Sequence, residues 1–349
     1  MAFAESSYLT PPRNDIELDE LLSRPSPADC RALKELDGDL LILGAGGKMG
    51  PSLVRLARRA VVEAGIDKRI IGVSRFSDPG IAASLAAEGI EVIHADLFDR
   101  EALSRLPSAA NVIFMAARKF GTSGDECGTW ATNAYLPMLV SDRFADSRIV
   151  AFSTGNVYPL TLIGLGGCDE KHPVGPIGEY AQSALARERM FEYFSNSRGI
   201  PVTLLRLNYA VDLRYGVLPD IARKVFEGYP VDLATGAVNA IWQRDANSIC
   251  LRAFGIAATP PRVLNITGPE TISVRSLAGR FGGLFGKQPY FQGEETATAL
   301  LSNAATCHAL FGYPSLSLET MIQYTASWIE CGGRSLGKPT HFEQRQGRF

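Results

Sequence analysis

The chain has 349 residues, of which 46% are hydrophobic and 21% charged, and its formal net charge is −2. This composition is typical of a globular protein, and the near-neutral charge argues against a nucleic-acid partner or attraction to an acidic membrane. No apolar run reaches the ~20 residues of a membrane span, and residues 1–13 lack a secretory pattern. The scattered cysteines and histidines predict reduced thiols, a cytoplasmic location and no metal site.

Residues 1–38 precede the first strand pattern. Prolines interrupt this extension, and residues 16–22 carry a short amphipathic pattern. The pattern predicts an arm that packs on the following domain or on a partner subunit. A disordered leader is the alternative, because chain termini are often loose.

From residue 39 onward, apolar strand patterns alternate with helical patterns. The strand patterns cover residues 40–43, 69–73, 91–95, 111–115, 148–152 and 202–206, and the helical ones cover 51–64, 81–88, 129–140 and 178–197. Near-continuous apolar strands separated by helices predict an α/β fold, a Rossmann-like doubly wound parallel sheet covered on both faces. The strands of such a sheet end at one edge, where ligands bind.

The rhythm changes after Asn208. Helical patterns cover 218–227, 245–254, 273–285 and 317–330, and short strand patterns cover 231–233 and 263–266. We therefore expect a dinucleotide-binding domain over 39–208 and a smaller mixed substrate lobe over 209–331, with a cleft between them. A polar tail without a periodic pattern follows over 332–349.

A glycine cluster follows the first strand pattern with the spacing Gly44-x-x-Gly47-x-x-Gly50. Glycine permits the positive φ of a tight turn and a close approach of the backbone to a ligand. The next helix would point its unpaired N–H groups at an anion such as a pyrophosphate. We expect this turn to bind the cofactor through Gly44, Gly46, Gly47, Lys48, Met49 and Gly50.

The end of the second strand pattern indicates which dinucleotide is bound. An acidic residue there binds the ribose 2′-OH of NAD, whereas an arginine accommodates the 2′-phosphate of NADP. Ser74 and Arg75 occupy this place, and no acidic residue follows directly. The sequence therefore favours NADP, with NAD as the alternative.

Further motifs follow in a fixed order. They are Asp96-Leu97, Ala116-Ala117, Asn133, Ser153-Thr154-Gly155-Asn156-Val157-Tyr158, Tyr180, Arg206-Leu207-Asn208-Tyr209, Arg244-Asp245 and Asn265-Ile266-Thr267-Gly268. With the glycine turn, they resemble the extended short-chain dehydrogenase/reductase family, whose members include sugar epimerases, dehydratases and reductases. The resemblance covers about residues 39–330. It implies that Asp96 and Leu97 lie at the adenine, that Ala116 and Ala117 pass beside the cofactor, and that the protein forms a homodimer through the helices after the fourth and fifth strands.

The resemblance makes Tyr180 the catalytic acid/base and Thr154 the hydroxyl that orients the substrate oxygen. A tyrosine needs a nearby cation to act near neutral pH, and the family places a lysine four residues after it. Here that position is Ala184. We hypothesise that Lys119 supplies the cation; Arg187, two helical turns after Tyr180, is the more distant candidate.

Three other polar side chains are candidates for the substrate site. Asn156 and Asn208 are expected to donate to a substrate hydroxyl, or else to be turn residues. His172 is an alternative acid/base, although a solvated loop histidine is the simpler interpretation.

Three functions are compatible with these residues. The first is an NAD(P)-dependent oxidoreductase or epimerase that acts on a sugar, a sugar acid or a nucleotide sugar. The second, motivated by Ala184, is a cofactor-binding protein without turnover that acts as a regulator or scaffold. The third is a dehydratase or lyase with transient oxidation, for which Asp169-Glu170 would supply an additional acid/base pair.

Overall fold

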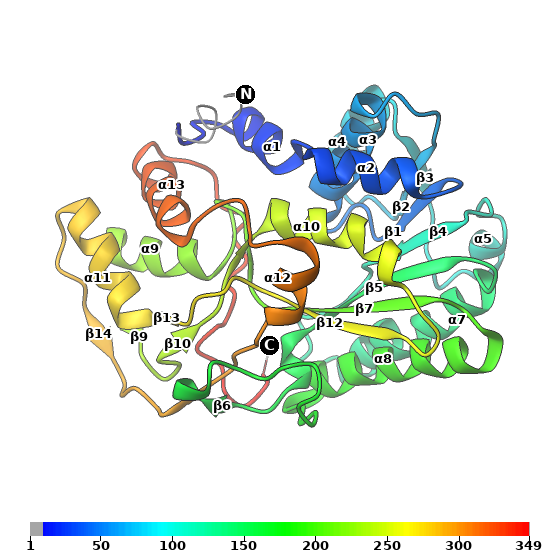
Figure 1. Cartoon of the computed structure of the whole chain (residues 1–349). Coiled ribbons are helices and arrows are strands. Elements are labelled where there is room, and N and C mark those ends of the chain that lie inside the picture. Colours follow the sequence, from blue (N-terminus) through cyan, green and yellow to red (C-terminus); the bar gives the residue numbers. More distant parts are fainter. Residues whose placement is uncertain (1–9, 349) are drawn as a thin grey trace.

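The computed structural model of the chain describes residues 10–348. Residues 1–9, which belong to the segment where the sequence predicts no secretory signal, and residue 349 lie outside the described part. A seven-stranded parallel sheet forms the centre, in the order β12-β7-β5-β4-β1-β2-β3 (Figure 1). Its strands are β1 (Leu40–Leu43), β2 (Ile70–Ser74), β3 (Glu91–His94), β4 (Asn111–Phe114), β5 (Arg148–Thr154), β7 (Val202–Leu207) and β12 (Arg262–Ile266).

Helices cover both faces of this sheet, which confirms the predicted Rossmann-like fold. Leu40 and Ile42 of β1 belong to one apolar core with the helices α3 and α10, and Leu41 and Leu43 belong to another with α7 and α8. Successive strand residues thus face opposite sides, as the period of two requires. The helices around the sheet are α3 (Gly50–Glu63), α4 (Pro79–Ala87), α5 (Arg100–Ser104), α6 (Glu126–Trp130), α7 (Leu136–Arg143), α8 (Gly178–Arg198) and α10 (Gln243–Arg252).

Two elements differ from the sequence-based expectation. The strand pattern at 263–266 was assigned to the lobe, but β12 pairs with β7 and extends the main sheet. A short apolar strand carries no signal of the sheet it joins, so its position depends on partners far along the chain. The helix expected over 129–140 is replaced by three consecutive helical segments, α6, a π-helical segment (Ala131–Tyr135) and α7, which together extend beyond these bounds. Asn133 lies in the π-helical segment.

The second lobe packs three helices around its own apolar core. These are α9 (Val217–Glu227), α11 (Val274–Phe285) and α13 (Leu318–Glu330). Short strand pairs and the unexpected helix α12 (Ala305–Phe311) join the lobe to the sheet. Within residues 10–348, no helix has the length and apolar character needed to cross a membrane, and the six cysteines are free thiols.

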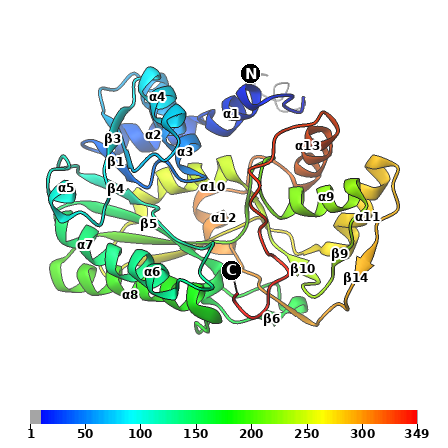
Figure 2. The same ribbon diagram turned by 180° about the vertical axis from the view of Figure 1, so that it is seen from behind.

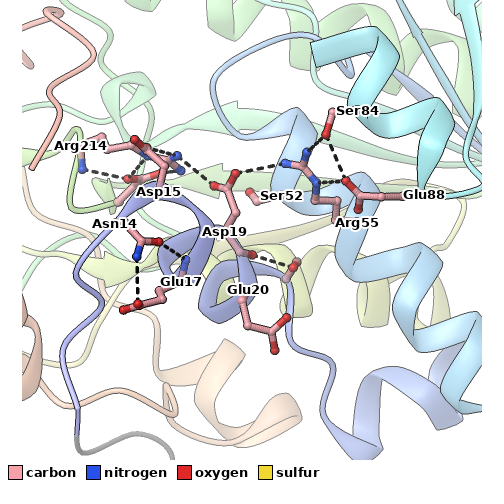
Figure 3. Close-up of polar contacts among 12 residues, drawn as sticks. Asn14, Asp15, Glu17, Asp19, Glu20, Ser52, Arg55, Ser84, Glu88 and Arg214 are labelled. Carbon is pink, nitrogen blue, oxygen red and sulfur yellow. Dashed lines mark hydrogen bonds and ion pairs between the residues drawn. The ribbon is translucent and has the colours of Figure 1, made fainter. Parts of the chain in front are cut away.

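The N-terminal extension forms two helices, α1 (Asp15–Ser23) and α2 (Pro27–Glu35), which pack on the domain. The carboxylate of Asp19 lies 3.4 Å from Arg55 of α3 and 2.9 Å from Arg214 of the second lobe (Figure 3). On α2, Asp29 is fully buried and forms an ion pair of 3.0 Å with Arg244. Of the two alternatives, the described residues show the packed arm, which connects both lobes.

The C-terminal segment also connects the two lobes. We call residues 333–348 the C-terminal strap; in Figure 2 it runs, in red, from α13 down between the lobes. The backbone N–H of Thr340 donates to Asp220 at 2.7 Å, and Lys119 donates to the carbonyl of Thr340 at 3.2 Å. Phe342 is buried in the core of the second lobe. Although its sequence is mostly polar, the tail is therefore an ordered segment, and the buried side chain of Phe342 holds it on the second lobe.

Candidate functional site

A pocket of about 260 Å³ opens where the strands β1, β4, β5 and β7 end and the second lobe begins. We call it the site pocket. Its lining joins residues from the glycine turn, the segment after β4, the end of β5, α8 and the start of the lobe. These residues are Gly44, Gly47, Lys48, Met49, Met115, Ala117, Lys119, Phe120, Phe152, Ser153, Thr154, Asn156, Tyr180, Arg187, Leu207, Asn208, Tyr209, Ala210 and Tyr215.

The glycine turn has the geometry that its spacing predicts. Gly44 has a φ of +97°, and a Cβ there would lie 2.8 Å from the backbone nitrogen of Ala116. A Cβ on Gly50 would lie 2.2 Å from the carbonyl oxygen of Ala45. No side chain caps the N-terminus of α3, in contrast to α4 and α5, which Asp78 and Asp99 cap. In the first turn of α3, the N–H of Gly50 donates to the carbonyl of Gly47 at 3.1 Å and Pro51 has no N–H. This leaves the N–H of Ser52 available to an anion such as a pyrophosphate.

The other predicted cofactor residues lie outside the lining of the site pocket. Gly46 borders a second cavity of about 350 Å³, which also touches Lys48 and Arg214. A Cβ on Gly46 would lie 2.8 Å from the Ser74 hydroxyl, so the turn and the end of β2 are in close contact. Arg75 is exposed.

Three residues were expected near the adenine or beside the cofactor and are also absent from that lining. The exposed Asp96 accepts a hydrogen bond from the N–H of Phe98 at 3.0 Å. Leu97 is buried, and Ala116 packs on the same apolar core. These positions follow the ends of β3 and β4, on the same sheet edge as the glycine turn.

Tyr180 and Thr154 meet in the wall of the site pocket. A hydrogen bond joins their side chains and lowers the pKa of Tyr180, whereas burial, the larger effect, raises it. The amide of Asn156 donates to the Thr154 hydroxyl at 2.9 Å and orients it. Tyr180 is 7% exposed. Since the net pKa of its phenol is raised, Tyr180 holds its proton at neutral pH.

Position 184 provides no cation. Ala184 is fully buried and packs with Val157, Tyr158 and Cys168. The guanidinium of Arg187 reaches the pocket instead, and its charge lowers the pKa of Tyr180. From its position seven residues after Tyr180, the sequence predicted Arg187 to be the more distant candidate. Sequence spacing does not show how far an arginine side chain extends along a helix.

Two lysines lie in the same pocket. Burial is the main cause that lowers the pKa of Lys48 to about 7 and that of Lys119 to about 8. The charge of Lys119 contributes to the low pKa of Lys48, and the charge of Asp212 opposes it. The ammonium of Lys48 lies 3.3 Å from the ring centroid of Tyr215. Two neighbouring ammonium groups that repel one another favour the binding of an anion between them.

The second lobe contributes pocket residues that the sequence did not single out. Tyr209 has a φ of +47°, which is uncommon for a tyrosine, and Tyr215 follows on the next loop. Burial raises the pKa of both phenols. Asn208, which was expected here, donates to the carbonyl of Leu300 at 3.4 Å. The signal that the sequence offers for Tyr209 is its place at the end of the motif Arg206-Leu207-Asn208-Tyr209.

A buried polar network supports the pocket from behind. Arg206 forms a 2.7 Å ion pair with Glu188 and donates to the Tyr158 hydroxyl at 2.8 Å. Tyr158 in turn donates to Asn265 of β12 at 2.8 Å. Glu188 also accepts from Ser153, the residue before Thr154. This network fixes the end of β5 against α8 and β7.

Three candidates lie elsewhere. Glu170 accepts from the backbone N–H of Asn265 at 2.9 Å, and Asp169 accepts from backbone N–H groups of its own turn. His172 is an exposed loop residue. Asp169 and Glu170, the acid/base pair expected for a dehydratase, are thus absent from the lining of the site pocket.

This sheet order, with a glycine turn and paired hydroxyls at one edge, defines the Rossmann-like class of α/β proteins. A sequence profile of the NAD dependent epimerase/dehydratase family matches residues 40–234, and the chain belongs to this family. No curated protein sequence matches the chain significantly.

Solved structures share the fold at low sequence identity. A UDP-glucose 4-epimerase from Thermotoga maritima is 18% identical, with a TM-score of 0.68 over 84% of this chain and 98% of that one. DesIV, a dTDP-glucose 4,6-dehydratase from Streptomyces venezuelae, is 17% identical, with a TM-score of 0.70 over 84% and 97%. A UDP-glucuronic acid 4-epimerase from Bacillus cereus is 16% identical, with a TM-score of 0.68 over 84% and 99%. This chain thus contains nearly the whole length of each relative and about a sixth more.

Proposed function

We propose that the protein binds a nicotinamide dinucleotide and acts as an oxidoreductase or epimerase on a secondary alcohol or ketone of a carbohydrate. The observation that carries this proposal is the hydrogen-bonded pair of Tyr180 and Thr154 in a pocket shared with the glycine turn. Membership of the NAD dependent epimerase/dehydratase family supports it. The relatives named above make a nucleotide sugar one candidate substrate, beside a free sugar and a sugar acid.

The residues present fit such a cofactor, because the N-terminus of α3 is uncapped and Lys48 lies beside it. When bound, the dinucleotide supplies the acceptor or donor of a hydride. Tyr180 gives a proton to the substrate oxygen or takes one from it, and Thr154 holds that oxygen by a hydrogen bond. Asn156 and Asn208 bind further hydroxyls. Two cations in the pocket lining, Lys119 and Arg187, are candidates for assisting Tyr180, and full activity of a folded Lys119→Ala variant would rule out Lys119.

The preference for NADP rests on Ser74 and Arg75 alone. The family is an NAD dependent one, and the structures of two of the relatives named above, DesIV and the UDP-glucuronic acid 4-epimerase, contain NAD. Fluorescence titration with both dinucleotides tests the preference, and Arg75→Ala should weaken NADP binding more than NAD binding. Tighter binding of NAD by the unaltered protein would refute the preference.

A substrate screen that follows the absorbance of the reduced cofactor tests the activity. Polyols, sugar acids and nucleotide sugars should include a substrate, and Tyr180→Phe should abolish turnover while dinucleotide binding remains. Binding without turnover of any of these classes would favour the alternative, a regulator or scaffold without catalysis.

We also propose a homodimer formed through the helices after β4 and β5. Aromatic side chains on these helices support it, since Trp130, Tyr135 and Tyr193 are 37%, 39% and 63% exposed. Sedimentation of the protein should give twice the monomer mass, and Tyr193→Glu should reduce it to the monomer.

A further inference from the structure

The site pocket contains a buried arginine whose charge is not neutralised by a bonded carboxylate. Arg187 is 2% exposed. Its guanidinium donates to the carbonyl of Phe152 at 2.9 Å and to the side-chain oxygen of Asn133, and both acceptors are neutral. Within residues 10–348, no ion pair to Arg187 is formed, and its Nε lacks a hydrogen-bond partner. A guanidinium stays protonated even when buried, so its positive charge acts on the groups around it.

Two titratable groups of the same helix, Tyr180 and Glu188, interact with the charge of Arg187. Glu188 already forms an ion pair with Arg206. Tyr180 and Arg187 are seven positions apart, which is about 10.5 Å along a helix axis at 1.5 Å per residue. Side chains of a helix lean toward its N-terminus, so the arginine extends back toward the tyrosine. Its bond to Phe152 places the guanidinium beside the end of β5, two residues before Thr154, which bonds to Tyr180.

We propose that Arg187 is the positioning residue that favours the ionised form of Tyr180, in place of a lysine four residues after the tyrosine. This inference rests on the proposed function, in which Tyr180 moves a proton. Position 184 is closed to a lysine, since Ala184 is fully buried among Val157, Tyr158 and Cys168. Arg187, one helical turn after Ala184, supplies the positive charge that a lysine at position 184 would carry, and its guanidinium lies beside β5.

Asn133 holds the arginine in this position. Its side-chain oxygen accepts from Arg187, and its amide nitrogen donates to the Ser183 hydroxyl at 3.0 Å. Ser183 donates to the carbonyl of Tyr180 at 2.9 Å. The π-helical segment that contains Asn133 therefore connects the arginine to the turn of α8 that carries the tyrosine.

Lys119 is less suited to this particular task. Its ammonium donates to the strap carbonyl of Thr340 at 3.2 Å. Burial lowers its pKa to about 8, so it carries less than a full charge in the range where a base is needed. Burial also lowers the pKa of Arg187, but a guanidinium starts from a higher pKa than an ammonium and keeps its proton. The charge of Arg187 lowers the pKa of the Tyr180 phenol, which agrees with the geometry.

The test measures the titration of Tyr180 without any substrate. The eleven tyrosines are replaced biosynthetically by a fluorinated tyrosine, whose lower intrinsic pKa keeps the titration within the range where the protein is folded. Fluorine NMR follows each ring, and the signal lost in Tyr180→Phe assigns residue 180. Arg187→Gln should raise the pKa of residue 180 by about one unit or more, as loss of an adjacent opposite charge does. Arg187→Lys should restore only part of the difference, because burial lowers the pKa of a lysine at this position.

Arg189→Gln is the matched control, because this arginine lies on the same helix but is 56% exposed and pairs with Glu192. It should leave the titration unchanged. Asn133→Asp provides a second route if Arg187→Gln does not fold, since a carboxylate bonded to the guanidinium neutralises it and should also raise the pKa of residue 180. An unchanged titration in a folded Arg187→Gln or Asn133→Asp variant would overturn the inference.

The same variants separate this inference from the proposed function. A shifted titration with no turnover of any carbohydrate would retain the arginine's effect and reject the activity. Where turnover is found, Arg187→Gln should lower kcat with little change in KM, and the limb of the pH profile that reports Tyr180 should move to higher pH. An unshifted pH limb would reject the arginine's effect and retain the activity.

Discussion

Phe342 holds the C-terminal strap on the second lobe, so Phe342→Ala should release the strap. The side chain is 2% exposed and belongs to the core that α9 and α13 form. Removal of a buried phenylalanine costs about 3–5 kcal/mol. Because every 1.4 kcal/mol is a factor of ten, the detached state should become more populated by a factor of about 10² to 4 × 10³.

Hydrogen exchange measures this change directly. The N–H of Thr340 donates to Asp220 at 2.7 Å and is protected while the strap is seated. Its exchange should accelerate by the same factor, whereas the amides of β1 should change little, because a terminal segment can detach without unfolding the domain. Tyr290→Ala, at a position that is 60% exposed on the same lobe, is the control and should have no effect.

One result would refute this reasoning. If the Thr340 amide and the β1 amides accelerate together, the strap and the sheet unfold as one unit. The strap would then be part of the core of the protein and would not open separately above the pocket.

The remaining predictions concern the turn, the lysines and the N-terminal arm. In a urea titration, Gly50→Ala should lower the free energy of unfolding by about 1–3 kcal/mol, since the new Cβ would lie 2.2 Å from a carbonyl oxygen. The control Gly279→Ala, in open space within α11, should raise the free energy of unfolding by about 0.5–1 kcal/mol. The free energy of unfolding should rise between pH 7 and 9, because the unfolded chain keeps protons on Lys48 and Lys119 that the native chain releases near pH 7 and 8; an equal rise in Lys48→Met would contradict this. Asp19→Asn should cost about 1 kcal/mol or less, because Asp19 is 34% exposed, and 0.5 M salt should erase most of the difference.

The parts of the fold that the sequence predicts are those with a local signal. The strand over 40–43, the glycine turn and the start of α8 at Gly178 agree with the structure, because apolar periodicity and glycine spacing are read within a few residues. Tyr180, Thr154, Asn156 and Asn208 share one pocket because each follows a strand or begins a helix at the same sheet edge.

The features that the sequence does not predict depend on long-range partners. The bond from Lys119 to Thr340 joins residues 221 positions apart. The strap also lacks a period, so its polar sequence does not distinguish an ordered segment from a loose tail. Arg187 was placed on the correct helix, but its reach depends on Asn133 and Phe152, which belong to other elements.

The two extensions act on the same property of the site, the relative position of the lobes. Asp19 of the arm bridges Arg55 of the domain and Arg214 of the lobe, and Thr340 of the strap bridges Lys119 of the domain and Asp220 of the lobe. Since the site pocket takes its walls from both lobes, each bridge lowers the freedom of the walls before a ligand arrives. A preorganised pocket loses less entropy on binding, so the extensions favour tight binding of a small ligand.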